Sequence, residues 1–249
     1  MKKNTSLKMI AVFLGVALTL LLTMLAVLPL LNKILAVEVM QPEAVTEAPV
    51  PLPAVPETVL LTAIYEMESD SKKISGITIE IFHVENDTAA YFAVPVDTKV
   101  NLSEALYKSL QTYAPELPQY LKLSNMAESF SAEYGLTGCN RIVSEVLGVS
   151  ITNYVRADKE TVLTWKEQLA QEKTGAGFFD AYANWLNCSE SNLTTEERWM
   201  YYESLRRVAF VVTETAPGSQ EKDGYLLSTK RSKERLQELM LRKQPAAQE

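Results

Sequence analysis

The stretch ITIEIFHVENDTAAYFAVPV, residues 77–96, decides the fold because it contains two apolar segments joined by a turn. Ile77, Ile79 and Ile81 alternate with other residues, as do the side chains on one face of a β-strand. His83 continues this alternation, so we interpret it as the end of a strand face rather than a catalytic base. ENDT favours a turn, since Asn and Asp tolerate turn backbones and bond their own main chain. The stretch therefore predicts a β-hairpin.

Strand-like and helical patterns alternate on both sides of this hairpin. The segment VLLTAIY (59–65) before it is rich in β-branched and aromatic residues and predicts a buried strand. The patterns that follow predict helices over 102–113 and 137–148, a strand over 151–157, helices over 158–170 and 194–207, strands over 208–215 and 224–229, and a helix over 230–243. This order predicts the α/β class, as a three-layer α/β/α sandwich over a mixed sheet.

Local signals mark the expected ends of two of these helices. Thr137 is the N-cap candidate of the helix over 137–148, and Gly148 is its stop. Thr194 and Glu197 have the spacing of a capping box, which predicts a helix beginning just after Thr194.

An uncharged apolar run of 23 residues occupies positions 9–31. At 1.5 Å per residue it would span the ~30 Å hydrocarbon core of a bilayer, so we expect an uncleaved transmembrane helix. Lys2, Lys3 and Lys8 precede it and only Lys33 follows closely. This excess of positive charge predicts a cytoplasmic N-terminus (1–8) and a single-pass protein of the cell membrane.

Five prolines fall between positions 37 and 58, where they disfavour helices and sheet ladders. We therefore expect 37–58 to be a Pro-rich, semi-rigid linker, followed by an extracytoplasmic domain over 59–249. From Val37 onward the chain carries 20 basic and 31 acidic residues, a net charge of −11. Such a surface repels a phosphate backbone, which argues against nucleic-acid binding.

Cys139 and Cys188 are the two cysteines of the chain. Outside the cytoplasm they can form a disulfide, which would stabilise the fold by about 3–4 kcal/mol. The alternative is two separate buried thiols. With a single histidine, the chain cannot assemble a structural zinc site from Cys and His alone.

Several motifs within residues 60–165 resemble the LytR-CpsA-Psr family. The family's strand ending in Ile-Pro-Arg-Asp-Thr is similar to VPVDT (94–98), and its Gly-Ser-Asp is similar to ESD (68–70). Its Lys-Leu-Asn-Ala segment looks like part of LKLSNMAESFSAEYG (121–135). Its LLGIPIDHYVRVD stretch resembles VLGVSITNYVRADKETV (146–162), which is the strongest of these matches.

The resemblance implies an α/β/α domain that transfers lipid-linked glycopolymers onto peptidoglycan, with an apolar pocket for the polyprenyl chain. It also implies that arginines and a divalent metal, Mg²⁺, hold the pyrophosphate, whose developing charge needs neutralising. Asp70 is the implied catalytic and metal-binding residue, and Asp97 has a supporting place beside it. Arg156, Arg206 and Arg207 are the candidates for binding pyrophosphate.

Two positions depart from the family pattern. Val96 stands where the motif has its arginine, and Ser75 and Gly76 stand where the family has a second metal-binding aspartate. We therefore expect a protein of envelope assembly that has lost transferase activity and is accessory or regulatory. Its expected partners are the bilayer through residues 9–31 and either a polyprenyl-linked glycan or an active paralogue.

Two alternatives stay open. The chain could be an active phosphotransferase whose pyrophosphate is held by Arg141, Arg156, Arg206 or Arg207, which would then converge beside an apolar cavity. It could instead be a structural envelope protein with a filled core and no ligand.

The candidate site residues also have simpler explanations. Asp70 lies in a polar loop, where aspartate is common for turn reasons, and Asp97 with Thr98 can cap the backbone at a strand end. Arg156 can pair with Asp158 or Glu160. The aromatic residues that could line a lipid pocket could equally fill the core; they are Tyr113, Tyr120, Phe130 and Tyr134.

Overall fold

The computed structural model describes residues 52, 55–68, 71–84, 88–131, 134–170, 176–187, 189–208 and 210–241. All of them belong to the compact unit Glu47–Glu249. The expected transmembrane helix over 9–31 and most of the expected linker lie outside the described residues. Among the helices of the described part, none is both long and apolar enough to cross a membrane.

A six-stranded mixed sheet forms the centre of the described unit, with strand order β7-β6-β1-β2-β3-β8. The strands are β1 (Val59–Glu66), β2 (Gly76–His83), β3 (Thr88–Val94), β6 (Asn153–Ala157), β7 (Glu190–Ser191) and β8 (Phe210–Thr215). β2 runs antiparallel to both β1 and β3, whereas β6 pairs parallel with β1 and β8 pairs parallel with β3. The carboxyl ends of β1, β3, β6 and β8 therefore share one edge of the sheet.

The hairpin expected over residues 77–96 is confirmed as the β2–β3 pair. Ile77 faces Val94, Ile79 faces Phe92, and Ile81 faces Ala90 across the two strands. The isoleucines on this face are at most 2% exposed, because one layer of helices covers them. His83 is the last residue of β2 and is buried, as the alternation predicts.

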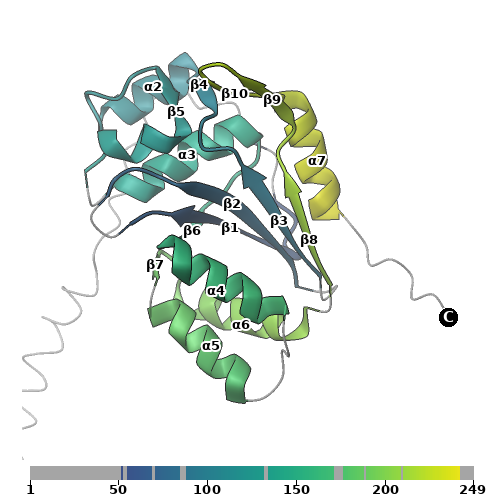
Figure 1. The fold of residues 1–249 in the computed structure, drawn as a ribbon. Coiled ribbons are helices and arrows are strands. Elements are labelled where there is room, and N and C mark those ends of the chain that lie inside the picture. The colour runs from purple at the N-terminus through teal and green to yellow at the C-terminus, as the bar shows by residue number, and fades with distance from the viewer. Residues whose placement is uncertain are drawn as a thin grey trace, which may run out of the picture. The chain divides into compact units, whose positions relative to one another are not determined.

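Helices cover both faces of the sheet, which confirms a three-layer arrangement (Figure 1). One layer holds α2 (Glu104–Gln111), the 3₁₀ helix η1 (Leu123–Ser129), α3 (Gly135–Leu147) and α7 (Thr229–Leu241). The other holds α4 (Lys159–Ala170), α5 (Ala176–Asn187) and α6 (Thr195–Arg207). Each layer packs its own apolar core against the sheet, and the second core is rich in aromatic residues.

Helix ends follow the local signals in two of three cases. Gly148 ends α3 in the left-handed region at φ 65°, which glycine adopts without steric cost. Thr194 and Glu197 form the predicted capping box of α6. The prediction for Thr137 is wrong, since α3 begins two residues earlier, at Gly135, after Tyr134 as N-cap.

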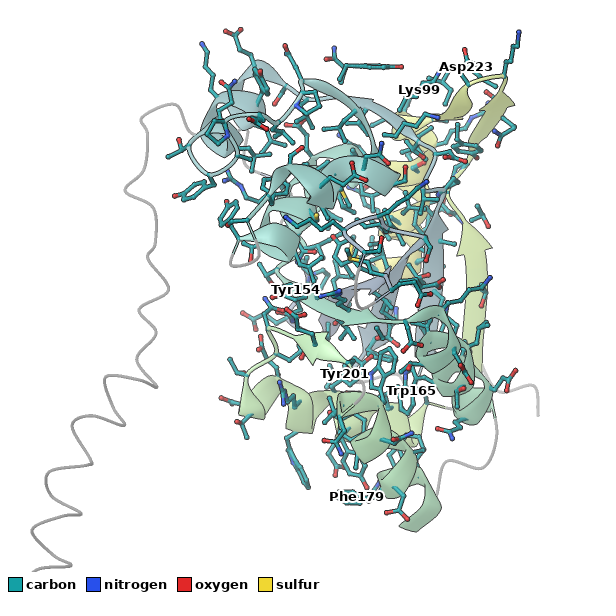
Figure 2. The ribbon with its side chains drawn as sticks, turned by 60° about the vertical axis from the view of Figure 1, so that its left-hand side comes forward. Lys99, Tyr154, Trp165, Phe179, Tyr201 and Asp223 are labelled. Carbon is teal, nitrogen blue, oxygen red and sulfur yellow. The ribbon has the colours of Figure 1, made fainter. Side chains whose placement is uncertain are left out.

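Some short elements differ from the expectation. The segment GSQE, which lies between the strands expected over 208–215 and 224–229, is itself the strand β9 (Gly218–Glu221), and it pairs with β10 (Gly224–Leu227) as a separate hairpin. A second small ribbon joins β4 (Lys99–Asn101) to β5 (Tyr120–Lys122). In Figure 2, Lys99 and Asp223 lie close together at this end of the unit, far from Phe179 on α5.

Candidate functional site

A cavity of about 360 Å³ opens at the sheet edge where β1 ends, between that edge and the start of α3. Its size is at the lower end of the usual range for small-molecule pockets. The polar or aromatic side chains of its wall come from the loop after β1, the η1–α3 connection, β6 and β7; they are Ser71, Lys72, Phe130, Ser131, Tyr154, Arg156 and Glu190. The wall thus combines two cations and one carboxylate with hydroxyl groups and apolar surface.

Both cations of the wall are bound to acceptors of the protein itself. Arg156 Nη1 lies 3.2 Å from Glu190 Oε2, and its Nη2 donates to the Glu68 carbonyl at 3.3 Å. Lys72 Nζ donates to the Phe130 carbonyl at 3.0 Å. An anionic ligand would therefore have to compete with Glu190 for the one guanidinium group at this cavity.

Tyr154 connects the cavity to the first core. Its ring packs against that core, and Figure 2 shows it at the side of the sheet. Burial raises the pKa of the Tyr154 hydroxyl, and the nearby Glu190 carboxylate raises it further. Tyr154 is therefore protonated at neutral pH and can donate a hydrogen bond to a ligand.

Asp70, the implied catalytic and metal-binding residue, lies outside the described residues. The next residue in the chain, Ser71, lines the cavity. Within the described part of the chain, no group of three or more His, Cys, Asp or Glu residues could hold a metal ion. The role of Asp70 stays a prediction.

Asp97 takes part in a backbone turn through its main chain. The Thr98 N–H donates to the Pro95 carbonyl at 3.0 Å, and the Asp97 carbonyl accepts from Tyr225 N–H at 2.9 Å. A side chain at Gly224 would bring its Cβ to within 2.7 Å of that carbonyl. The Asp97 side chain is exposed and is not part of the cavity wall. The described bonds of Asp97 are thus main-chain bonds, and the role of its carboxylate stays a prediction.

Val96, at the position of the missing arginine, packs against the first core. Its carbonyl accepts a 2.8 Å hydrogen bond from Ser124 N–H in η1. The segment VPVDT thus connects the sheet to η1 and to the β9–β10 hairpin by main-chain bonds.

Gly76 stands where the family pattern has a second aspartate, and the side chain of Glu66 occupies the space next to it. Gly76 faces Glu66 across β1 and β2, and a Cβ at Gly76 would lie 2.5 Å from the Glu66 carboxylate. The carboxylate lies 3.8 Å from Lys166 Nζ on α4. A carboxylate is therefore present at this point of the sheet, but a lysine already provides its counter-charge.

The remaining candidate arginines lie elsewhere. Arg206 is 3.8 Å from Glu203, and Arg207 Nη2 donates to the Val84 carbonyl at 3.3 Å. Val84 follows the end of β2, which runs antiparallel to β1, so these arginines lie at the sheet edge opposite the cavity. Arg141 donates to the Tyr134 and Ser109 hydroxyl groups at 3.0 and 2.7 Å. Of these four arginines, Arg156 alone lines the cavity.

The aromatic residues near the cavity divide between core and surface. Phe130 is 2% exposed and lines the cavity, whereas Tyr120 is 60% exposed. Tyr113 and Tyr134 stack on each other with ring centroids 4.2 Å apart. Only part of the predicted aromatic set therefore faces this site.

A second polar cluster, on the other face of the sheet, was not expected from the sequence. Glu80 is fully buried and accepts hydrogen bonds from the Tyr91 and Tyr201 hydroxyl groups. Burial raises the pKa of Glu80 to about 7, although both hydrogen bonds and Lys166 act to lower it. Figure 2 shows Tyr201 and Trp165 between the sheet and the α4–α6 layer. The one sign of this cluster in the sequence is that Glu80, a carboxylate, lies between Ile79 and Ile81 in the alternating strand pattern.

Cys139 is a free thiol buried in α3. This agrees with the alternative of separate buried thiols, and Cys188 lies outside the described residues. Burial raises the pKa of the Cys139 thiol well above its usual range.

Comparisons with known proteins give likenesses in structure. No family model and no curated protein matches the chain. A putative transcription regulator from Eubacterium siraeum is 10% identical over 79% of this chain and 99% of its own, with a TM-score of 0.50. TagV of B. subtilis is 11% identical over 75% and 98% of the two chains, with a TM-score of 0.49.

A third solved structure is the "LytR-CPS2A-psr family protein YwtF (TagT) with bound octaprenyl pyrophosphate lipid", 12% identical over 74% and 90% of the two chains, with a TM-score of 0.48. The structural neighbours thus include LytR-CPS2A-Psr proteins. At identities of 10–12% these likenesses concern the fold alone.

Proposed function

We propose that this chain is a membrane-anchored, extracytoplasmic protein of envelope assembly that binds an anionic, polyprenyl-linked glycan without transferring it. The ligand class comes from the motif resemblance over residues 60–165. The wall of the cavity beside α3, which combines apolar surface with two cations and one carboxylate, supports it.

The observation that carries the proposal is the dispersal of the candidate arginines. Transfer from a pyrophosphate requires the leaving group's developing charge to be neutralised by several cationic groups acting together. Among the described residues that line the cavity, Arg156 supplies the one guanidinium, and Glu190 already neutralises it. This arrangement suits reversible binding of one phosphate group better than stabilisation of a transition state.

The described carboxylates do not fit a divalent cation. Mg²⁺ prefers near-octahedral oxygen coordination, commonly with one or two carboxylates. Glu66, which fills the place above Gly76, is close to the Lys166 ammonium group instead. The proposed binding therefore needs no metal. If Mg²⁺ takes part, Asp70 is the residue that the family resemblance implies as its ligand.

Binding and transfer can be separated in one set of experiments on the full-length chain in detergent. A polyprenyl-pyrophosphate-linked glycan with Mg²⁺ should bind without turnover, and Arg156→Gln should weaken binding about tenfold. Glu221→Gln, which removes an exposed carboxylate close to Lys99, is the control. Turnover that Asp70→Ala abolishes would overturn the proposal and favour an active transferase. Absence of binding would favour the ligand-free structural protein.

The anchoring and the accessory role are parts of the same proposal. Residues 9–31 are the proposed single membrane span, with residues 1–8 in the cytoplasm and the domain outside. The chain should then resist carbonate extraction, while external protease should digest its domain in intact cells. An accessory role further implies an active paralogue as partner, and chemical cross-linking in the membrane should capture it.

A further inference from the structure

Within the described part of the chain, the outer strand β8 has a neighbouring strand on one side only. It is the last strand of the six-stranded sheet and pairs with β3 (Figure 1). Its sequence, FVVTET, is largely β-branched and contains neither Lys nor Pro, the residues with which proteins commonly protect a sheet edge. No other described segment pairs with this strand.

The direction of the backbone groups of β8 follows from one hydrogen bond. Ala216 N–H, just beyond the strand, donates to the Ala93 carbonyl of β3 at 2.8 Å. Backbone groups alternate in direction along a strand, so even-numbered residues of β8 point toward β3. The N–H and C=O groups of Val211, Thr213 and Thr215 therefore point outward, and all three residues are exposed.

We propose that this edge pairs with β8 of a second copy of the chain, antiparallel and centred on Thr213. In this register Thr213 faces Thr213 of the second copy, and Val211 faces Thr215. Each facing pair joins residues whose backbone groups point outward, so about six inter-strand hydrogen bonds can form. The result is one continuous sheet running through both copies.

A second copy fits this edge because the strand is complementary to itself. In an antiparallel pair, the side chains of facing residues must lie on the same face of the sheet. Facing residues must also both point their backbone N–H and C=O groups at the partner strand. The register centred on Thr213 meets both conditions. Facing threonines are a favourable cross-strand pair, and no like charges meet. Glu214 faces Val212 of the second copy, and its carboxylate is already held by two hydrogen bonds from Arg235.

Helix α7 crosses the sheet on one face. Its Arg235 hydrogen-bonds Glu214 of β8 itself, while its Leu239 carbonyl lies 2.8 Å from His83 Nε2 of β2, two strands in from the edge. On the other face, Val211 is 37% exposed, and the remaining outward residues of β8 on that face are exposed as well.

Cysteine cross-linking of the full-length chain tests the register, in a background with Cys188→Ser. Thr213→Cys should give a disulfide-linked dimer under mild oxidation, because facing Cα atoms in a hydrogen-bonded pair are about 5.5 Å apart. Val211→Cys alone should not cross-link, whereas a mixture of Val211→Cys and Thr215→Cys chains should. Failure of Thr213→Cys to cross-link, or equal cross-linking of Val211→Cys with itself, would overturn the proposal.

Analytical ultracentrifugation then tests association without a covalent link. Thr213→Pro removes an outward N–H that pairs with no described backbone group, and should raise the dimer dissociation constant at least tenfold. Thr213→Val keeps the N–H and should leave the constant within about twofold of the parent. Thermal unfolding of both variants shows whether the fold is kept, and if Thr213→Pro does not fold, the cross-linking pattern decides. A chain that stays monomeric at all concentrations contradicts the proposal and leaves the edge to another protein or unoccupied.

Discussion

The Tyr91 hydroxyl donates a 2.7 Å hydrogen bond to the Glu80 carboxylate, and both side chains are buried between the sheet and α6. Tyr201 from α6 donates a second hydrogen bond to the same carboxylate, and Lys166 reaches over the Tyr91 ring at 5.9 Å from its centroid. Glu66 lies beyond Lys166 at the sheet edge. One titratable group thus connects two strands to one helix, with a lysine of another helix nearby.

Stability should fall as the pH rises through the pKa of Glu80. Burial raises the pKa of this carboxyl from 4.5 to about 7, so between these values the folded chain binds a proton that the unfolded chain releases. The contribution to the free energy of unfolding is therefore complete below pH 4.5 and is lost as the pH rises through about 7. From pH 5 to pH 8 the loss should be about 2–3 kcal/mol.

Glu80→Gln should remove this pH dependence, because an amide does not ionise in this range. Urea unfolding of the full-length chain in detergent at pH 5 and pH 8 measures the difference. Glu128→Gln, which changes an exposed glutamate, is the matched control and should keep the parent's slope. Equal slopes for the parent and Glu80→Gln would contradict the assignment.

Tyr201→Phe should destabilise the chain more at pH 8 than at pH 5. The variant keeps the ring, which meets Phe82 edge-on at a centroid distance of 4.9 Å, but loses a hydrogen bond to a buried carboxylate. Such a loss costs about 1–3 kcal/mol when the acceptor is ionised. Urea unfolding at the two pH values measures it. Tyr120→Phe, at a residue that is 60% exposed, should change stability by less than about 0.5 kcal/mol.

Gly148→Ala should destabilise the chain by about 1–2 kcal/mol, because φ at this position is 65° and a Cβ is disfavoured there. The new methyl group would also displace the flexible Lys233 side chain. Gly177→Ala is the control with the opposite sign, since it lies in α5 with nothing within 4 Å of the added Cβ. Replacing that helical glycine should stabilise the chain by up to about 1 kcal/mol. Thermal unfolding compares the two variants, and equal shifts would argue against the left-handed end of α3.

Local patterns predicted most of the main sheet and several helix ends. The alternation of Ile77, Ile79 and Ile81 predicts the β2–β3 pair because a strand's period is two and its register follows from one buried face. Gly148 and the Thr194–Glu197 pair act within one helical turn, so the sequence shows them directly.

Other elements depend on partners far away in the sequence. β9 is polar and exposed and forms by pairing with β10, so its four residues look like a turn. One glycine precedes α5 and a second, Gly177, lies in its first turn. The helix also carries aromatic residues on more than one face, which hides the helical period; Phe179 is 51% exposed whereas Phe178 and Trp185 are buried.

The sequence predicted where the candidate site lies but not which residues form it. Motif resemblance led to Arg156 and to Asp70; Arg156 lines the cavity, as does Ser71, which follows Asp70 in the sequence. Arg206 and Arg207 lie at the opposite sheet edge because α6 ends there, next to the end of β2. The spacing of residues in the sequence does not reveal where α6 ends relative to β2. Glu80 was missed because a carboxylate facing away from three isoleucines normally faces solvent, and here α6 covers it.

Cys139 should be inert in the folded chain. Burial raises the pKa of its thiol, and the thiolate is the reactive form. In a Cys188→Ser background, Ellman's reagent should label the chain in urea and leave it unlabelled in native buffer. Labelling at the same rate in both conditions would show that the α3 core opens readily. The variant Cys139→Ser, which has no thiol in this background, sets the zero of the assay.

Glu190→Gln should strengthen the binding of an anion at the cavity. The Glu190 carboxylate lies 3.2 Å from Arg156 and is more exposed than the guanidinium, so it competes with an anion for the same donor. Removing its charge should raise the affinity for inorganic pyrophosphate by roughly fivefold, the equivalent of ~1 kcal/mol for an exposed ion pair. Isothermal titration calorimetry on the full-length chain measures this. Glu221→Gln, which removes a carboxylate 3.8 Å from Lys99, should leave the affinity unchanged. Combining Arg156→Gln with Glu190→Gln should abolish the gain, and a gain that survives in this double variant would place the anion at some other group.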